Sequence, residues 1–414
     1  MSTVEHEAHH RNSLIEIYQA ALKRVEGRES VSNWLKQNPF PGPLRVIAIG
    51  KAAQSMVWGA YDVLDRQIAQ TLLISKHGHI DQAWCRQQGC LMHESAHPIP
   101  DETSLQGGQK LLDFIASDAR LPLLFLISGG ASSLVEVVID GLGLDDLARV
   151  NGWMLGSGLD ILQMNTIRKA LSRIKGGGLL AYLDQPRVVG LAISDVPGDD
   201  PAAIGSGLLT PDEGLAGRLS TLTLPSWLQD RLDRVEARQV DMPAKPPKIA
   251  IVANLQLARE AAADHAAKLG YRVSLRDEFL AGDAAATGKS LAQELLRGPS
   301  GIVIWGGETT VNLPSEPGRG GRNQHLALAA ARELAGSSNC YLLAAGTDGS
   351  DGPTEDAGAL VDGGTVSRAA LHGMEVDRSL ANADSGSLLE VSCDLISTGP
   401  TGTNVMDLVI GLRE

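Results

Sequence analysis

The stretch RVIAIGKAAQSM at residues 45–56 sets the expected fold of this chain. Its apolar run ends at a glycine and continues into a helix-forming segment, and the same pattern recurs at 121–134 and 187–201. Continuous apolar runs bounded by glycine are typical of strands buried on both faces, as in a parallel sheet covered by helices. The sequence therefore predicts an α/β protein with a doubly wound sheet in its N-terminal part.

Length and composition favour two domains. At 414 residues the chain exceeds what one hydrophobic core usually supports. The segment DMPAKPPK at 241–248 is rich in proline and lysine between apolar stretches, which is typical of a linker. We therefore expect an N-terminal domain over 1–242 and a C-terminal α/β domain over 243–414, which opens with a strand, a helix and a strand over 248–275.

The charge balance limits the kinds of partner. A net charge of −13 argues against binding to nucleic acid or to anionic membranes, since both depend on a surplus of lysine and arginine. The N-terminus lacks the apolar run of a signal peptide, and the four cysteines show neither metal-type nor framework spacing. We expect a cytoplasmic protein that binds small molecules, neither nucleic acid nor membranes, with a homodimer as its assembly.

Lys51 is the first candidate for ligand binding. Gly50 ends the strand predicted at 45–50, and Lys51 begins the following helix, which places an ammonium near exposed N–H groups. The carboxyl ends of strands line the ligand crevice in open α/β sheets, so we expect phosphate binding here. The alternative is an exposed lysine at a helix start. A Walker A loop is excluded, because it needs a glycine where Arg45 stands.

The segment ISGGASSL at 127–134 is a second candidate. A Gly-Gly turn after a strand, flanked by hydroxyls, predicts a nest that binds an anion through backbone N–H groups and side chains. The alternative is a tight turn with a capping serine. The residues concerned are Ser128, Gly129, Gly130, Ser132 and Ser133.

Acidic residues also follow predicted strands, where carboxylates can hold Mg²⁺ or accept a hydroxyl proton. The alternative for some of them is a turn or a helix cap. They are Asp195, Asp199 and Asp200 in ISDVPGDDP, Asp348 and Asp351 in GTDGSDGP, and Glu308 after WGG.

Two further segments of the second half suit anions. GRGGRNQH at 318–325 carries Arg319 and Arg322, and a guanidinium suits bidentate contact with phosphate or carboxylate, although a solvated loop is the alternative. TGPTGTNVMDL at 398–408 contains Thr401, Thr403 and Asn404 in a turn that we expect to precede a helix, with its N-terminus open to an anion.

The first residues contain one more motif. HEAHH at residues 6–10 satisfies the metalloprotease pattern H-E-x-x-H, but it has no supporting apolar helix face and no evident third ligand in the sequence. We interpret the segment as a frayed polar terminus.

Eight segments, taken in order, closely resemble the motif series of the class II glycerate kinases, or glycerate 2-kinases. They are GKAAQSM, SGGASSL, NTIRKALSRIKGG, ISDVPGDDP, GGETTV, GRGGRNQ, GTDGSDGP and TGPTGTNVMDL, and the similarity runs from about residue 10 over nearly the whole chain. The resemblance implies ATP- and Mg²⁺-dependent conversion of D-glycerate to 2-phosphoglycerate. It further implies a cleft between a Rossmann-like N-terminal domain and a smaller C-terminal MOFRL domain, with the segment near 398–408 returning to that cleft.

The resemblance also implies roles for individual residues. Lys51 and Arg322 match the family's essential basic pair, which would neutralise charge on the transferring phosphoryl group. Asp195 and Asp351 are the candidates for binding Mg²⁺ or orienting the acceptor hydroxyl. The expected substrate- and nucleotide-binding residues are Gly50, Ser128, Gly129, Gly130, Ser132, Ser133, Asp199, Asp200, Glu308, Asn323, Thr401, Thr403 and Asn404.

The sequence departs from the family pattern at two places. Residues 206–209 read S-G-L-L where S-G-P-T is usual, and His325 stands where an acid normally follows R-N-Q. A hydroxypyruvate reductase is the second interpretation, because relatives carry that label, but no G-x-G-x-x-G followed by a ribose-binding acid is evident. A non-catalytic nucleotide- or organic-acid-binding protein is the third, and it would need neither the basic pair nor the acids.

Overall fold

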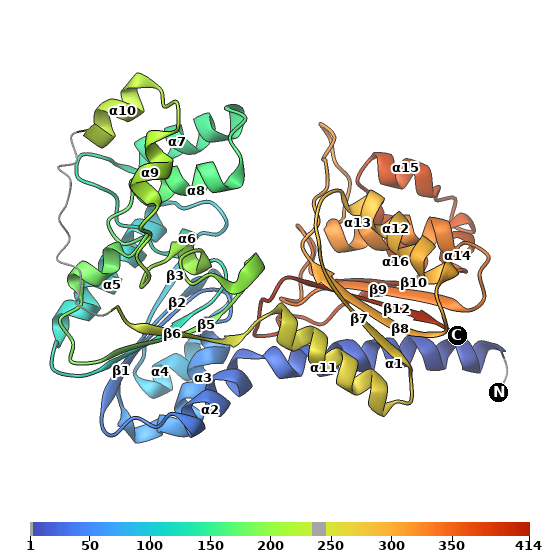
Figure 1. Cartoon of the computed structure of the whole chain (residues 1–414), viewed down its shortest axis with the longest axis horizontal. Coiled ribbons are helices and arrows are strands. Elements are labelled where there is room, and N and C mark those ends of the chain that lie inside the picture. Colours follow the sequence, from blue (N-terminus) through green and yellow to red (C-terminus); the bar gives the residue numbers. More distant parts are fainter. Residues whose placement is uncertain (1–2, 234–245) are drawn as a thin grey trace. The chain divides into compact units, whose positions relative to one another are not determined.

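The computed structural model describes residues 3–233 and 246–414 and separates the chain into two compact units (Figure 1). The N-unit is Gly27–Val252, and the C-unit combines Met1–Glu26 with Ala253–Glu414. The boundary expected between residues 242 and 243 lies outside the described residues. In the described ranges, no helix is both long and apolar enough to cross a membrane.

The N-unit is built on a six-stranded sheet in the order β3-β2-β1-β4-β5-β6. Neighbouring strands from β3 to β5 pair in parallel, as the apolar runs predict. This is the strand order of a Rossmann fold, and the predicted doubly wound α/β class is confirmed. The strands are β1 (Leu44–Ile49), β2 (Ile68–Lys76), β3 (Leu91–Ser95), β4 (Leu123–Ile127), β5 (Val188–Ile193) and β6 (Lys248–Ala253).

Helices cover both faces of this sheet because alternate residues of each buried strand point to opposite sides. α2 (Gly27–Gln37) and α3 (Ala53–Leu64) lie on one face, and α5 (Glu102–Ser117) and α6 (Ala131–Leu134) lie on the other (Figure 1). Phe114 of α5 packs with Phe125 of β4 in the core of that second face. The remaining short helices of this region are α4 (Gln82–Gln88), η1 (Asp65–Gln67), η2 (Gly178–Tyr182), η3 (Pro197–Asp199) and η4 (Ile204–Ser206).

A second helical layer of the N-unit has its own small core. Val150, Met154, Ile167 and Leu228 form this cluster, separate from the residues that cover the sheet. The layer therefore has apolar packing of its own, and it consists of α7 (Leu144–Gly156), α8 (Ile161–Ala170), α9 (Leu215–Ser220) and α10 (Ser226–Asp233).

The C-unit contains a mixed six-stranded sheet in the order β11-β10-β9-β12-β8-β7. β7 and β8 are parallel, and β12 runs antiparallel to both β8 and β9. The strands are β7 (Val273–Leu280), β8 (Gly301–Gly307), β9 (Cys340–Gly346), β10 (Gly358–Asp362), β11 (Leu395–Ile396) and β12 (Asp407–Arg413).

The helices of the C-unit also lie on both faces of its sheet (Figure 1). α1 (Thr3–Val25) and α11 (Leu255–Lys268) cover one face. The other face carries α12 (Ala284–Arg297), α13 (Arg322–Leu334), α14 (Thr365–Ala370), α15 (Val376–Ala381) and α16 (Ser385–Val391).

Three local expectations from the sequence are wrong. β6 belongs to the N-unit sheet and β7 to the C-unit sheet, so the two strands do not form one β-α-β unit. The turn at 398–406 leads into strand β12 rather than a helix, because β8 and β9 supply pairing partners along both of its edges. Residues 6–10 are part of helix α1 and are not a frayed terminus.

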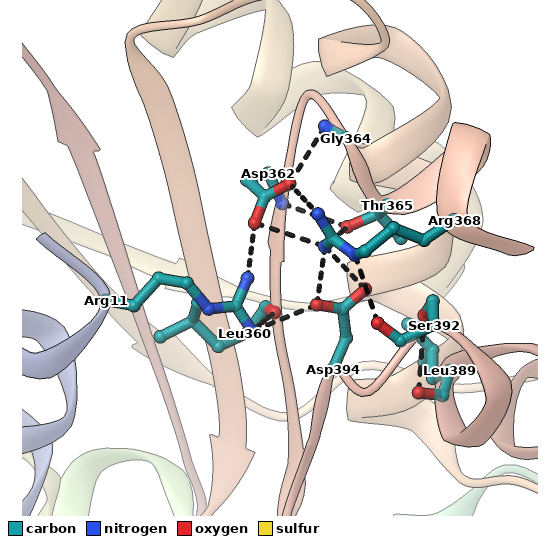
Figure 2. A network of polar contacts seen from close by, with 9 residues as sticks. All are labelled: Arg11, Leu360, Asp362, Gly364, Thr365, Arg368, Leu389, Ser392 and Asp394. Carbon is teal, nitrogen blue, oxygen red and sulfur yellow. Dashed lines mark hydrogen bonds and ion pairs between the residues drawn. The ribbon is translucent and has the colours of Figure 1, made fainter. Parts of the chain in front are cut away.

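Buried ion pairs attach helix α1 to the rest of the C-unit. Arg11 of α1 contacts Asp362 and Asp394, and Arg368 of α14 contacts the same two acids (Figure 2). The side chains of Asp362 and Asp394 are 3% and 0% exposed. Burial acts to raise the pKa of Asp362, but Arg368 and Arg11 outweigh it and hold that pKa below its usual value. Asp362 and Asp394, both desolvated, thus share Arg11, which precedes them in the sequence by 351 and 383 residues.

We predict that Asp394→Asn lowers the free energy of unfolding by about 3 kcal/mol, because it leaves two guanidinium groups with one buried carboxylate. The matched control is Asp377→Asn, whose partner Arg332 is 40% exposed while Asp377 itself is 84% exposed. That change is expected to cost about 1 kcal/mol or less. Urea unfolding followed by circular dichroism checks both values, and equal losses would contradict a structural role for the buried network.

Candidate functional site

The turns after β1 and β4 are bonded directly to each other. Ser128 N–H donates to Ile49 O at 3.0 Å, and Lys51 N–H donates to Gly129 O at 2.9 Å. The Ser128 hydroxyl accepts the Ala52 N–H at 3.1 Å. Between β1 and β4 the strand order of the sheet changes direction, which is where doubly wound proteins bind their ligands.

Gly50 permits this close approach. Its φ is +133°, and a Cβ at this position would overlap the backbone and hydroxyl of Ser128. Only glycine adopts this conformation without strain and leaves room for the neighbouring turn. Gly50 is therefore required by the junction itself, in addition to any contact with a ligand.

Lys51 and His97 flank the Gly-Gly turn. A Cβ on Gly130, whose φ is +84°, would lie 2.9 Å from His97 Cδ2 and 3.4 Å from Lys51 Cγ. Helix α3 begins at Ala53, two residues after the predicted start at Lys51. The structure thus brings the Lys51 side chain beside the glycines that the sequence marks for anion binding.

A cavity of about 490 Å³ opens at this edge of the sheet. Of the expected site residues, Gly130, Ser132, Ser133 and Asp195 line it. The Ser132 hydroxyl lies 2.7 Å from that of Ser206, while Ser133 Oγ donates to Gly130 O at 3.0 Å. Ser132 and Asp195 thus lie in the same cavity although they follow different strands.

Arg168 supplies positive charge to this cavity. It lines the cavity wall and donates to Asn165 Oδ1 at 3.3 Å. No carboxylate in the described part of the chain pairs with it, and burial lowers its pKa. The other lining cation, Lys175, is already paired with buried Glu136. Arg168 is therefore the guanidinium that can meet an anionic ligand here.

Arg168 enters the sequence analysis only within the motif NTIRKALSRIKGG and is given no role of its own there. The available signal was its place in the motif NTIRKALSRIKGG, directly after the apolar Ile167. In the structure α8 ends at Ala170, and the side chain of Arg168 lies in the cavity wall. The desolvation of Arg168 depends on how the helices pack together, and no local sequence pattern indicates that packing.

The other two acids of ISDVPGDDP do not line the cavity. Asp200 Oδ1 accepts the Ala202 N–H at 2.9 Å, which is the turn contact that the alternative interpretation describes. Asp199 lies in η3 with a φ of +55°.

Ser128 is fully buried, so its hydroxyl is used by the junction between the two turns.

Arg322 of the C-unit is held by two acids. Its Nε and Nη2 donate to the two oxygens of Asp407 at 2.6 and 3.0 Å, and Nη1 lies 2.6 Å from Glu308 Oε1. Burial acts to lower the pKa of Arg322, but Asp407 and Glu308 outweigh it and raise that pKa. Asp407 was missed by the sequence analysis. The available signal was an acid at the start of the apolar run from Leu408 to Leu412.

Asp351 caps the helix that carries Arg322. Its Oδ1 accepts the Asn323 N–H at 3.1 Å, and its Oδ2 accepts the Gln324 N–H at 2.8 Å. The Asn323 side chain also donates to Asp351 at 3.3 Å. Burial raises the pKa of Asp351 to about 7, against the hydrogen bonds that lower it. Both carboxylate oxygens therefore serve to hold the N-terminus of α13.

A cavity of about 370 Å³ lies beside Arg322 within the C-unit. Gly320, Gly321 and His325 line it together with Arg322. His325 Nδ1 lies 3.0 Å from Ser385 Oγ, and burial lowers the pKa of this histidine. At the position where the resemblance drawn from the sequence leads us to expect an acid, the chain thus presents an imidazole that favours its neutral form.

The three residues expected near the C-terminal turn have separate contacts. Thr401 Oγ1 donates to Thr347 O at 2.5 Å, and Asn404 Oδ1 accepts the Met406 N–H at 3.4 Å. Thr403 is buried. None of the three lines the cavity beside Arg322.

Comparisons with known proteins agree with this architecture. Residues 13–224 match a domain of unknown function, DUF4147, and residues 301–407 match the MOFRL family. A D-glycerate 2-kinase from Thermotoga maritima is 34% identical, over 89% of this chain and 90% of the relative. A putative hydroxypyruvate reductase from Agrobacterium vitis is 32% identical, over 96% of this chain and 93% of that protein. The crystal structure of a Thermotoga maritima glycerate kinase matches with a TM-score of 0.85 at 32% identity, covering 98% of this chain and 99% of that one.

The Rossmann-order sheet with glycine turns at its switch point, followed by a mixed α/β unit, defines a two-unit α/β protein. The chain belongs to the glycerate kinase family and carries a MOFRL domain in its C-terminal part. The resemblance drawn from the eight sequence motifs is thereby confirmed.

We predict that Gly50→Ala lowers the free energy of unfolding by about 2 kcal/mol or more, because the methyl group overlaps Ser128 and the backbone is strained at this φ. Gly217→Ala is the control, since nothing lies within 4 Å of a Cβ at that helical position. The control is expected to be neutral or about 1 kcal/mol more stable. Denaturant unfolding checks both, and a tolerated Gly50→Ala would refute the close junction of the two turns.

Proposed function

We propose that this protein is a glycerate 2-kinase, which transfers the γ-phosphoryl group of ATP to the C2 hydroxyl of D-glycerate. The observation that carries the proposal is the N-unit cavity, where the glycine turn beside Lys51 meets a desolvated arginine. Phosphoryl transfer depends mainly on positioning and on positive charge around the transferring group. This cavity offers both to a small anionic substrate.

Arg168 is proposed to bind the glycerate carboxylate. A guanidinium binds a carboxylate through two parallel hydrogen bonds, and desolvation strengthens that contact. The hydroxyls of Ser132 and Ser206 lie in the same cavity and can bond the substrate hydroxyls. These side chains would fix a three-carbon acid while Lys51 and the N–H groups of the glycine turn contact phosphate.

In the proposed reaction the C2 oxygen of glycerate bonds to the γ-phosphorus as the bond from that phosphorus to the β–γ bridging oxygen breaks, and this oxygen leaves with ADP. The C2 hydroxyl gives up its proton to a carboxylate or to water. Lys51 would neutralise charge on the phosphoryl oxygens. We also propose a part for Arg322, whose guanidinium is oriented by Asp407 and Glu308. Asp351 is proposed to position Arg322 through its cap on α13.

The donor set of the cavity fits Mg²⁺, which binds through one or two carboxylates together with substrate phosphates. Asp195 is the residue that would hold it, and the ion would neutralise phosphate charge. Accepting the hydroxyl proton is the other role for Asp195. An Mg²⁺ titration of Asp195→Asn distinguishes the two, because only loss of a metal ligand raises the Mg²⁺ concentration required.

The reductase alternative fits the N-unit less well. The turn after β1 has Ala52 and Ser55 where the dinucleotide fingerprint has its second and third glycines. The next strand, β2, ends at Lys76, where a site for NAD has an acid about 20 residues beyond the glycines. ATP and D-glycerate are therefore preferred to a nicotinamide cofactor and hydroxypyruvate.

The direct test incubates the protein with D-glycerate, ATP and Mg²⁺ and identifies the product by ³¹P NMR, which separates 2-phosphoglycerate from 3-phosphoglycerate. We expect 2-phosphoglycerate. Oxidation of NADH with hydroxypyruvate, without phosphoglycerate formation, would overturn the proposal in favour of the reductase. Binding of ATP without either reaction would favour a non-catalytic protein.

Two substitutions are expected to separate binding from chemistry. Arg168→Met should raise the KM for glycerate by about 10- to 100-fold, because a hydrogen-bonded charge pair is lost. Lys51→Ala should lower kcat by about 100-fold or more, because charge stabilisation in the transition state is lost. Arg66→Met, at a side chain 98% exposed, is the control and should leave both constants unchanged. An unchanged KM in Arg168→Met would remove Arg168 from the substrate site.

A further inference from the structure

The motif at residues 6–10 meets a third polar side chain in the folded C-unit. His6 and His10 lie one turn apart on α1, and Glu414 follows strand β12. His6 Nδ1 lies 3.3 Å from Glu414 Oε1, and His10 Nε2 lies 3.7 Å from Glu414 Oε2. One ligand atom from each of the three residues lies within 4.8 Å of the others.

Hydrogen bonds fix which nitrogen of His10 carries a proton. Ser13 Oγ donates to His9 O at 3.1 Å, so it accepts from Tyr271, whose hydroxyl donates to it at 3.1 Å. The Tyr271 oxygen is then the acceptor for His10 Nδ1, at 3.3 Å. Each hydroxyl has one proton to give, so the chain of donors begins at Nδ1–H of His10.

This arrangement leaves the other nitrogen of His10 with a lone pair. His10 is 6% exposed, and within the described residues its Nε2 has no hydrogen-bond partner. A buried acceptor nitrogen therefore faces a carboxylate, which is also an acceptor, and a cation between them would satisfy both.

We propose that His6, His10 and Glu414 form a Zn²⁺ site. Bonds of about 2.0–2.2 Å to nitrogen and oxygen place two tetrahedral ligand atoms roughly 3.3 Å apart, close to the two distances that the structure shows. Imidazole and carboxylate are ligands that suit Zn²⁺.

The surroundings of His10 match those of a metal ligand. A histidine that binds a metal usually donates its other ring N–H to a fixed acceptor, and Tyr271 has that position here. Glu414 is held by its own N–H, which donates to Asn339 O at 2.9 Å. The ion would connect the start of α1 to the end of β12 and so stabilise the C-unit.

The test uses the full chain without a histidine tag, in a Cys393→Ser background because Cys393 is an exposed thiol that could bind Zn²⁺. Equilibrium dialysis is expected to give one tightly bound Zn²⁺ per chain, and saturating Zn²⁺ should raise Tm by about 3 °C or more. Co²⁺ in its place should give the strong visible absorption of tetrahedral coordination.

His6→Ala and Glu414→Gln change exposed side chains, so both variants should fold, and each should weaken Zn²⁺ binding by about 10-fold or more. His9→Ala alters an exposed neighbour on the same helix and should bind as the parent does. The proposal is overturned if the parent does not bind Zn²⁺, or if the His6 and Glu414 variants bind it as tightly as the parent.

Discussion

The structure depends on the close approach of two turns at the point where the strand order of the N-unit sheet changes direction. Gly50 leaves room for Ser128, and the backbone of Lys51 is bonded to Gly129. This junction sets the position of the Gly-Gly turn and of the cavity beyond it. A side chain at residue 50 would separate the turns, so the same constraint governs both the fold and the position of the cavity.

The two cavities present their positive charge differently. Arg322 is held by Asp407 and Glu308. Arg168 lines its cavity without a described carboxylate partner. A chain with a net charge of −13 can thus attract an anion at selected points, because burial and local pairing determine the field of a site more than the overall charge does.

Sequence patterns predict the parts of this protein that are determined locally. Apolar runs ending in glycine indicate strands such as β1 and β4, and the tight turns after them follow from their glycines and serines. Contacts between distant segments could not be predicted in this way. Arg322 pairs with Asp407, 85 residues away, and Arg11 pairs with Asp362 across 351 residues. The C-terminal segment forms β12 because two strands offer it edges, which outweighs its local turn pattern.

The central claim is that the turns after β1 and β4 bind the substrates, and hydrogen exchange tests it most directly. Peptides covering residues 50–56 and 128–134 are compared with and without ATP, Mg²⁺ and D-glycerate. We expect slower exchange in both peptides when the ligands are present, because their N–H groups would contact phosphate. Unchanged exchange in both peptides under conditions of turnover would contradict the claim.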